Sequence, residues 1–200
     1  FHIIQVLALK LGGYNAHKKT VDILNLGLMS CLRILGTSFK FNGEKKLPTD
    51  KPIIFVSNHQ SMFDIPPLIW KLRKHHPKFV SKKELGTGIP SISYNLKHGG
   101  SVLIDRKKPD EAIQLLKEFG TYISNNKYSA IIYPEGTRSK DGKMKPFKSK
   151  GLEAIINNTP NAYIIPITIN NTWKITHKGS FPLGVGAKVS IYVHQPILAS

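Results

Sequence analysis

Two short clusters of polar residues have the types and the spacing needed for chemistry. The first covers residues 58–64 and contains His59, with the Asp64 carboxylate at the end of the cluster. An imidazole paired with a carboxylate can take a proton from a hydroxyl near neutral pH, because the carboxylate fixes the tautomer and orientation of the ring. The second cluster, residues 135–139, follows an apolar run and Pro134. We expect the two clusters to form one site.

The spacing of His59 and Asp64 indicates that the histidine lies outside regular helix. In an α-helix, residues five positions apart point about 140° away from each other. Pro66 and Pro67 favour a helix that starts near Asp64, and Ser61 with Asp64 fits a capping box that would start it slightly earlier. We therefore expect His59 in a turn, with Asp64 reaching back to it from the helix entrance. The alternative is that His59 binds a loop carbonyl and Asp64 only caps the helix.

Residues 135–138 have the composition of an anion-binding turn at the end of a strand. Gly136 allows close approach of the backbone, Arg138 can grip phosphate oxygens with its forked guanidinium, and Thr137 adds a hydroxyl. Glu135 fits less well, because a carboxylate repels phosphate. We expect Glu135 to hold Arg138, a backbone amide or an acceptor hydroxyl in place, and a purely structural salt bridge is the alternative.

The elements that must position these clusters follow an alternating pattern. From residue 51, short apolar runs alternate with helical stretches, which favours an α/β fold with a mixed, mostly parallel sheet flanked by helices. A helix is predicted at Asp110 to Asn125, and the lysine-rich run from Ser139 to Lys150 is predicted to be a solvated loop. The predicted strands are 52–57, 78–81, 101–105, 129–133, 163–169 and 188–193.

The first 40 residues contain two apolar stretches, 1–11 and 21–35. They could be amphipathic helices lying on a membrane, with Lys and Arg side chains facing lipid phosphates, or ordinary helices packed on the core. Neither is expected to span ~30 Å of hydrocarbon. We therefore expect membrane-associated helices at 1–40 and a catalytic domain at 41–200. Because the chain begins at Phe1, we expect the natural amino terminus to lie outside this sequence.

Composition narrows the classes of partner. The 200 residues include 29 Lys and Arg against 12 Asp and Glu, and the formal charge of +17 must attract polyanions. No helix-turn-helix spacing, zinc-ligand pair or aromatic RNA-binding signature is visible, so a nucleic-acid partner is not expected. The single cysteine, Cys31, excludes an internal disulfide and favours a reducing compartment. Its apolar neighbours predict a small buried side chain and not a nucleophile.

The two clusters, read together as Asn-His-x-x-x-x-Asp and Pro-Glu-Gly-Thr-Arg-Ser, resemble the glycerolipid acyltransferase family, in particular the 1-acylglycerol-3-phosphate acyltransferases. Two weaker blocks occur in the expected order, so the resemblance covers about residues 50–170. Tyr133 stands where this family commonly has Phe. The weaker blocks are Lys82-Lys83-Glu84-Leu85 with Gly99 and Ile104-Asp105-Arg106, and then Ile165-Pro166-Ile167.

The resemblance implies a role for each matched position. His59 would be the general base that deprotonates an acceptor hydroxyl, and Asp64 would orient and stabilise the imidazolium. The implied reaction moves a fatty acyl group from acyl-CoA or acyl-carrier protein to the free hydroxyl of 1-acylglycerol-3-phosphate, with no metal and no bound cofactor. The residues implied to bind the substrate are Lys82, which is preferred over its neighbour Lys83, and Arg106, Glu135, Gly136, Thr137 and Arg138.

The resemblance also implies a membrane protein of the peripheral or monotopic kind, at the cytoplasmic face, with anionic lipid as its partner. Two alternatives stay open. The acceptor could be another lysolipid, such as a lyso-ornithine lipid, because such motifs identify chemistry better than headgroup. The chain could also be a non-catalytic basic module that binds membranes or nucleic acid. His75 and His76 match no motif, and we expect surface or packing roles for them.

Overall fold

A computed structural model describes residues 1–44, 46–179 and 181–199. Within these ranges the strands form one eight-stranded sheet in the order β1-β7-β6-β2-β5-β3-β4, with β8 paired to β6. The five neighbours β6, β2, β5, β3 and β4 run parallel, so their carboxyl ends share one edge of the sheet. Strand β7 is antiparallel to β6 and β1 is parallel to β7. The predicted mixed, mostly parallel α/β sheet is confirmed.

The six predicted strands correspond to β2 to β7, and two further strands were not predicted. Strand β1 is a half-exposed edge strand that begins before residue 40, so it lies across the expected boundary between the two parts of the chain. Strand β8 is too short to show an alternating pattern. The bounds are β1 Ser38–Gly43, β2 Ile53–Ser57, β3 Pro77–Lys82, β4 Val102–Ile104, β5 Ser129–Ile132, β6 Tyr163–Asn170, β7 Lys188–Val193 and β8 Ile197–Leu198.

The helix predicted at 110–125 is present as α4, and the run predicted to be a loop gives way to α5 at Ser149. The α-helices are α1 His2–Ile34, α2 Ile65–Lys71, α3 Pro90–His98, α4 Pro109–Asn126 and α5 Ser149–Ile156. Short 3-10 helices follow several strands and helices: η1 Met62–Asp64, η2 Arg73–His75, η3 Lys83–Gly86 and η4 Thr172–Ile175.

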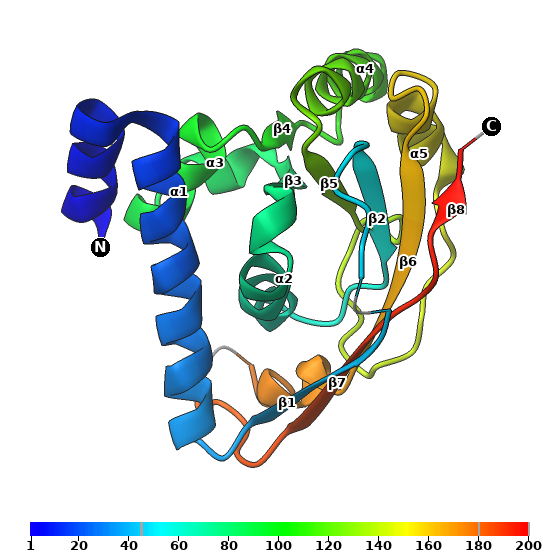
Figure 1. Cartoon of the computed structure of the whole chain (residues 1–200). Helices are drawn as coiled ribbons and strands as arrows, with labels where there is room; N and C mark the ends of the chain where they lie inside the picture. The colour runs from blue at the N-terminus through cyan, green and yellow to red at the C-terminus, as the bar shows by residue number, and fades with distance from the viewer. Residues whose placement is uncertain (45, 180, 200) are drawn as a thin grey trace.

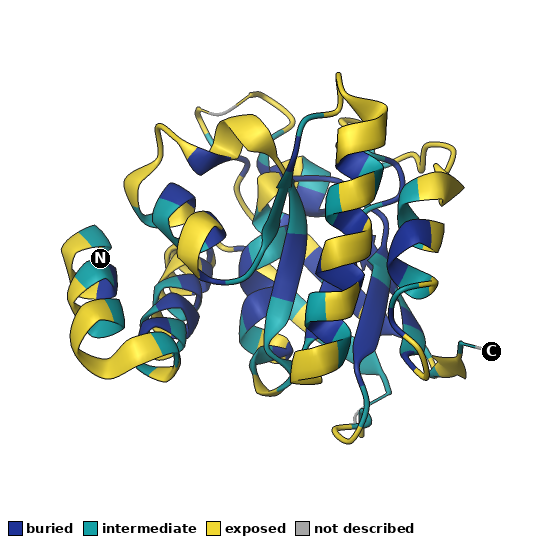
Figure 2. Cartoon of the chain, turned by 90° about the horizontal axis from the view of Figure 1, so that it is seen from above, coloured by how far each residue is buried: buried dark blue, intermediate teal, exposed yellow. Residues whose placement is uncertain are grey.

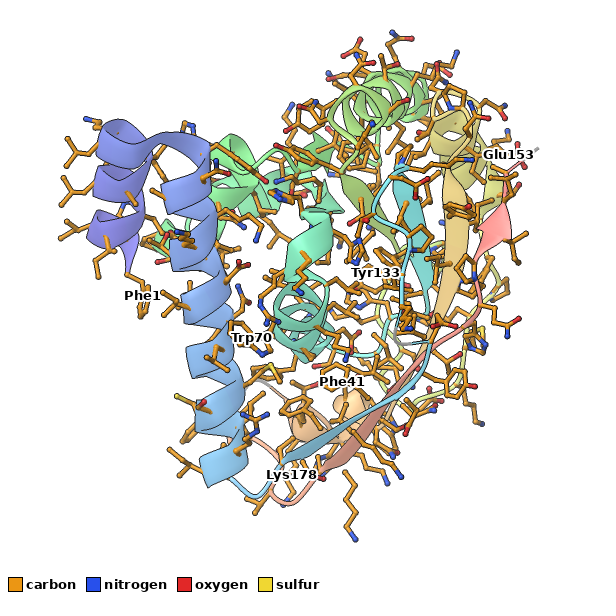
Figure 3. The ribbon with its side chains drawn as sticks, viewed as in Figure 1. Phe1, Phe41, Trp70, Tyr133, Glu153 and Lys178 are labelled. Atoms are coloured by element: carbon orange, nitrogen blue, oxygen red, sulfur yellow. The ribbon has the colours of Figure 1, made fainter. Side chains whose placement is uncertain are left out.

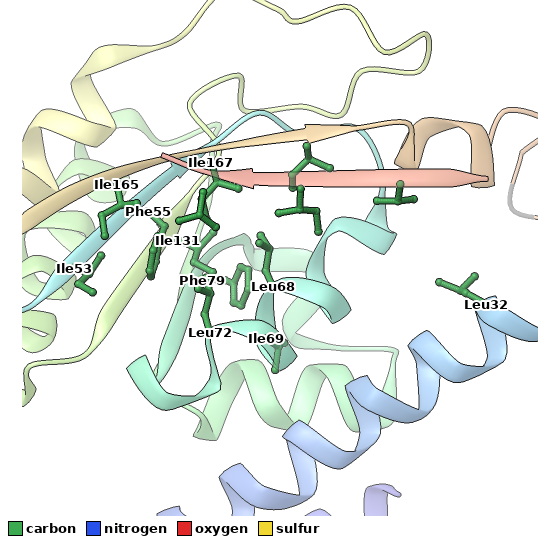
Figure 4. Close-up of a cluster of buried hydrophobic side chains, with 14 of the residues drawn as sticks. Leu32, Ile53, Phe55, Leu68, Ile69, Leu72, Phe79, Ile131, Ile165 and Ile167 are labelled. Carbon is green, nitrogen blue, oxygen red and sulfur yellow. The ribbon is translucent and has the colours of Figure 1, made fainter. Parts of the chain in front are cut away.

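Helices cover both faces of the sheet (Figure 1). Helices α4 and α5 pack on one face, α2 packs on the other, and α1 lies outside α2 and α3. Each face has its own core, because successive side chains of a strand point to opposite sides. Ile53 and Phe55 of β2 join Leu68 of α2 in one core (Figure 4), whereas Ile54 joins Ile123 of α4 in the other. The central strands are therefore buried on both faces.

Helix α1 consists of two segments that fold back on each other at Gly13 (Figure 1). The φ of this residue is 65°, a value that glycine adopts without strain. The second segment begins directly after the bend, earlier than the stretch 21–35 predicted from the apolar pattern. Among the described residues, no helix combines the length and the apolar character that a bilayer crossing requires.

The prediction that Cys31 is buried is wrong, since its side chain is exposed. Met29 and Leu32 are buried on the inner face of α1. Cys31 lies about 200° around the helix axis from Met29. The apolar neighbours along the sequence therefore do not surround the cysteine in space. Much of the outer surface of α1 is exposed (Figure 2).

Candidate active site

The turn that carries His59 is anchored to the sheet by Asn58. The Asn58 side chain accepts a hydrogen bond from the backbone N–H of Ile169 at 2.7 Å and donates one to its carbonyl at 2.8 Å. This buried amide extends the pairing of β2 with β6 by one step beyond the end of β2. His59 therefore leaves the sheet from a rigid point, at the edge where the parallel strands end.

His59 and Asp64 are in direct contact, as their spacing predicts. His59 Nδ1 lies 2.7 Å from Asp64 Oδ2, and the Asp64 side chain is fully buried. His59 lies in a turn, and Ser61 and Asp64 form the expected capping box at the start of η1. Because the carboxylate accepts, Nδ1 donates, and in the neutral imidazole Nε2 then keeps its lone pair. The arrangement leaves Nε2 able to act as a base.

The second cluster clamps the backbone of His59 on both sides. Glu135 Oε1 accepts from the His59 N–H at 2.7 Å, and the Ser139 N–H donates to the His59 carbonyl at 2.8 Å. The other oxygen of Glu135, Oε2, accepts from the backbone N–H of Lys145 at 2.8 Å. Glu135 is 3% exposed, so its carboxylate joins two loops. Of the expected alternatives for Glu135, the structure shows the one in which its carboxylate accepts hydrogen bonds from backbone amides. Because both oxygens are occupied in this way, the position does not fit the substrate contact implied by the resemblance.

The Tyr133 ring stacks on the imidazole of His59, with ring centroids 4.0 Å apart and planes 15° from parallel. Its hydroxyl oxygen is buried and has no hydrogen-bond partner within the described part of the chain. Burial, and to a smaller extent the Asp64 carboxylate, raises the pKa of the Tyr133 phenol well above its usual value. An aromatic ring at this position supports the imidazole from one face.

The candidate anion-binding residues surround the turn at Gly136, whose φ is +70°. The Arg106 guanidinium, which follows β4, donates to the Gly136 carbonyl. Thr137 and Arg138 are exposed beside this turn. Lys82 is exposed at the carboxyl end of β3. The sheet thus brings cationic side chains from β3, β4 and the turn after β5 to the edge that carries His59.

Several residues of the site were missed by sequence reasoning. Lys145 lies in the run predicted to be only solvated surface, yet its Nζ donates to Thr137 Oγ1 at 3.1 Å and to the Arg138 carbonyl at 2.9 Å. Thr172, two residues after the end of β6, donates its hydroxyl proton to Asp64 Oδ1. The polar run at residues 170–172, which follows the predicted strand 163–169, is the signal that could have identified Thr172.

This arrangement can bring an anionic group and a hydroxyl to one base. A phosphate bound at the cationic edge would present a nearby hydroxyl to His59 Nε2. The buried Asp64 carboxylate would stabilise the imidazolium that forms when the proton is taken. The geometry therefore suits activation of a hydroxyl on a phosphate-bearing molecule.

Comparisons with known proteins agree with this chemistry. A family model described as Acyltransferase matches residues 38–170. The chain is 36% identical over 159 residues to a chloroplastic 1-acyl-sn-glycerol-3-phosphate acyltransferase of Brassica napus, covering 79% of this chain and 44% of that protein. It is 27% identical over 153 residues to the alpha 1-acyl-sn-glycerol-3-phosphate acyltransferase of Ovis aries, covering 76% and 52%. The chain spans about half the length of the curated relatives it matches.

A similar fold occurs in the crystal structure of the 1-acyl-sn-glycerophosphate (LPA) acyltransferase PlsC from Thermotoga maritima. The two structures superpose with a TM-score of 0.73 at 26% sequence identity, over 95% of this chain and 72% of that chain. The similarity therefore extends beyond the residues matched by the family model.

Proposed function

We propose a reaction for this chain from the premise that it belongs to the acyltransferase family. The chain transfers a fatty acyl group from a thioester to the free hydroxyl of 1-acylglycerol-3-phosphate, which yields phosphatidate for phospholipid synthesis. The observation that carries the proposal is the 2.7 Å contact between His59 Nδ1 and the buried Asp64 carboxylate at the sheet edge. The names of the relatives support the choice of acceptor.

In the proposed step, His59 Nε2 takes the proton of the acceptor hydroxyl as its oxygen attacks the thioester carbonyl carbon. The C–O bond forms, and the tetrahedral intermediate then collapses with cleavage of the C–S bond. The thiolate leaves and takes the proton from the imidazolium, which returns His59 to its starting state. Asp64 holds the orientation of the ring through both proton transfers and stabilises the imidazolium that exists between them.

The acceptor phosphate would lie against the cationic residues at the same edge. Arg138 is the first choice for a forked contact with phosphate oxygens, and Lys82 and Arg106 add positive charge. Gly136 and Thr137 shape the turn beside the phosphate. The donor is the thioester of coenzyme A or of acyl-carrier protein, which is a substrate, so the proposed reaction requires no bound cofactor.

The chain is proposed to work at a membrane surface, on the cytoplasmic face, with anionic lipid as its partner. The exposed apolar side chains of the first segment of α1 include Ile3, Leu7 and Leu11. The formal charge of +17 would concentrate anionic lysolipid near the site. Both features support peripheral association of the N-terminal helices with lipid.

Replacement of His59 by Ala tests the proposed base. We expect thioester consumption in the presence of lysophosphatidate to fall by about 10² to 10⁴. His98→Ala removes an exposed histidine at the end of α3 and should leave the rate close to that of the parent. A folded His59→Ala variant as fast as the parent would refute the general-base role.

A panel of acceptors tests the substrate. Thioester release is measured with lysophosphatidate, with a lyso-ornithine lipid and with lysophosphatidylcholine, and we expect lysophosphatidate to be used best. Preference for the lyso-ornithine lipid would keep the chemistry and overturn the acceptor. Salt-sensitive binding to nucleic acid with no thioester release from any acceptor would instead favour a basic binding module.

A further inference from the structure

The two oxygens of the Asp64 carboxylate have different partners. Oδ2 accepts hydrogen bonds from His59 Nδ1 and from the backbone N–H groups of Gln60, at 2.8 Å, and Ser61, at 3.1 Å. Oδ1 accepts a hydrogen bond from the hydroxyl of Thr172, which is fully buried at the start of η4, two residues after the end of β6. The carboxylate therefore has donors on both oxygens, as a buried charge requires.

We infer that Thr172 is a positioning residue of the His59–Asp64 pair, acting through Asp64 and not on the substrate. This inference rests on the proposed function, because it assigns a partner to the proposed base. The backbone N–H groups of Gln60 and Ser61 hold Oδ2, but with Oδ1 unbound the plane of the carboxylate could still tilt about the Cβ–Cγ bond and weaken the contact of Oδ2 with Nδ1. The Thr172 hydroxyl fixes the plane of the carboxylate, so that Oδ2 stays directed at Nδ1.

The surroundings of Thr172 orient its hydroxyl toward Asp64. A second acceptor, Gln60 Oε1, lies 3.3 Å from Thr172 Oγ1 and cannot donate. The hydroxyl has one proton, and of the two acceptors the charged carboxylate forms the stronger hydrogen bond. Gln60 is itself held by the donation of Nε2 to the Gly142 carbonyl at 3.4 Å. The single proton of Thr172 is thus directed to Asp64.

A second contact keeps η4 against the turn that carries His59. Ser61 Oγ lies 3.3 Å from Thr176 Oγ1, which directly follows η4. Two polar contacts, through Thr172 and Thr176, therefore join the segment after β6 to the segment after β2. Because both segments follow parallel strands that are hydrogen-bonded neighbours in the sheet, the alignment of the carboxylate depends on the packing of β6 against β2.

Kinetics of Thr172→Val and Thr172→Ser test the inference. Valine keeps the shape of threonine and removes the hydroxyl, whereas serine keeps the hydroxyl. We expect kcat of Thr172→Val to fall about tenfold to a hundredfold, the range for loss of a hydrogen bond to a charged group, with both KM values within about twofold of the parent. Thr172→Ser should retain most of the parent kcat.

Thr159 offers a matched control for loss of a buried hydroxyl. It is fully buried in the segment after α5, where it donates to the Ile155 carbonyl at 2.7 Å and contacts the Gly120 carbonyl of α4 at 3.2 Å. Thr159→Val should therefore lose thermal stability much as Thr172→Val does, while keeping the parent kcat. A Thr172→Val variant with the parent kcat, an equal loss in Thr159→Val, or failure of serine to restore the rate would each overturn the inference.

The tautomer of His59 provides a readout that does not depend on the acceptor. In ¹⁵N spectra, with the His59 signals assigned by comparison with His59→Gln, the parent should carry the proton on Nδ1. Thr172→Val should show a partial shift to Nε2, and Thr172→Ser should not. An unchanged tautomer in Thr172→Val refutes the inference even if the parent transfers acyl groups. A parent inactive on lysophosphatidate but showing the expected shift refutes only the proposed acceptor.

Discussion

Glu135 is the residue whose role the structure changes most. Its position in the Pro-Glu-Gly-Thr-Arg turn suggests contact with a substrate, yet both of its oxygens accept backbone N–H groups, from His59 and Lys145. A buried carboxylate with two amide donors is stabilised in place by charge-assisted hydrogen bonds. Glu135 thus connects the base to the loop that carries Lys145. Arg138, which is exposed three residues further on, remains the residue proposed to bind phosphate.

Replacement of Glu135 by Gln tests this structural role. Glutamine has one acceptor oxygen, so its NH₂ group would face one of the two backbone N–H groups and leave that group unpaired. We expect the free energy of unfolding to fall by about 1–3 kcal/mol, together with a lower kcat because the backbone of His59 loses a constraint. The measurements are urea denaturation and steady-state kinetics.

The matched control is Glu153→Gln, at an exposed position on α5 (Figure 3). It should change neither stability nor kcat. If Glu135→Gln kept the parent stability and raised only the KM of the acceptor, Glu135 would contact the substrate and the structural role would be wrong.

At the level of elements, a buried lysine joins α1 to β3 and α3. Lys78 is 4% exposed, and its Nζ donates to Tyr14 Oη at 2.7 Å and to the Gly99 carbonyl at 2.6 Å. The rings of Tyr14 and Tyr128 lie 4.5 Å and 5.0 Å from the amine. His76, which stacks on Tyr128 and contacts Tyr14 Oη, has the packing role expected for it. This cluster fixes α1 at the amino end of β3, away from the site.

The ionisation of Lys78 predicts a pH-dependent stability. Burial, with the nearby Lys18 charge, lowers the pKa of Lys78 to about 7, and Asp22 opposes this shift. Between pH 7 and about 10 the unfolded chain then binds more protons at this residue than the folded chain, so the free energy of unfolding rises with pH. Burial raises the pKa of Tyr14, so stability should fall again above about pH 10, where the unfolded tyrosine ionises.

We expect Lys78 to contribute a rise of about 2 kcal/mol between pH 7 and pH 9. Urea denaturation gives the free energy of unfolding of the parent and of Lys78→Met at the two pH values. The contribution of Lys78 is the difference between the two proteins in the slope of this free energy against pH. Lys117→Met, at an exposed position on α4, should keep the slope of the parent. A Lys78→Met variant with the slope of the parent would show that the buried amine does not titrate in this range.

At the scale of the whole molecule, the site lies at one edge of the sheet, whereas the N-terminal segment of α1 lies outside the core with exposed apolar side chains. The parallel strands bring the site together, because β2, β3, β4, β5 and β6 all end at one edge. The first segment of α1 lies beyond the second, away from the sheet (Figure 1). Leu7 and Leu11 of this segment are 50% and 86% exposed. A helix with such an apolar outer face suits the surface of a lipid bilayer.

Vesicle binding tests this role for α1. Replacement of Leu7 and Leu11 together by Ser should weaken binding to vesicles of phosphatidylglycerol and phosphatidylcholine by at least about tenfold, because two apolar side chains no longer enter the lipid. The control replaces Ile197 and Leu198 by Ser, at exposed apolar positions of β8 on the opposite side of the molecule (Figure 1). Co-sedimentation measures both variants. Equal losses in the two variants would rule out a special role for α1.

Much of the fold was predictable because its signals are local. Alternating short apolar runs and helical stretches identified β2 to β7 and α4, and the spacing of His59 and Asp64 with the two prolines identified the turn. The features that were missed have weak local signals. Strand β1 is a half-exposed edge strand. Whether Cys31 is buried or exposed depends on which face of α1 meets the core.

The sequence by itself determined the mostly parallel α/β class and the resemblance to an acyltransferase family, and it predicted the contact between His59 and Asp64, five residues apart. Only the tertiary structure showed which residues hold His59 and Asp64 in position. Glu135 reaches His59 across 76 positions of the chain, and Thr172 reaches Asp64 across 108. Such contacts leave no periodic pattern in the sequence, because they exist only once parallel strands place their carboxyl ends at a common edge.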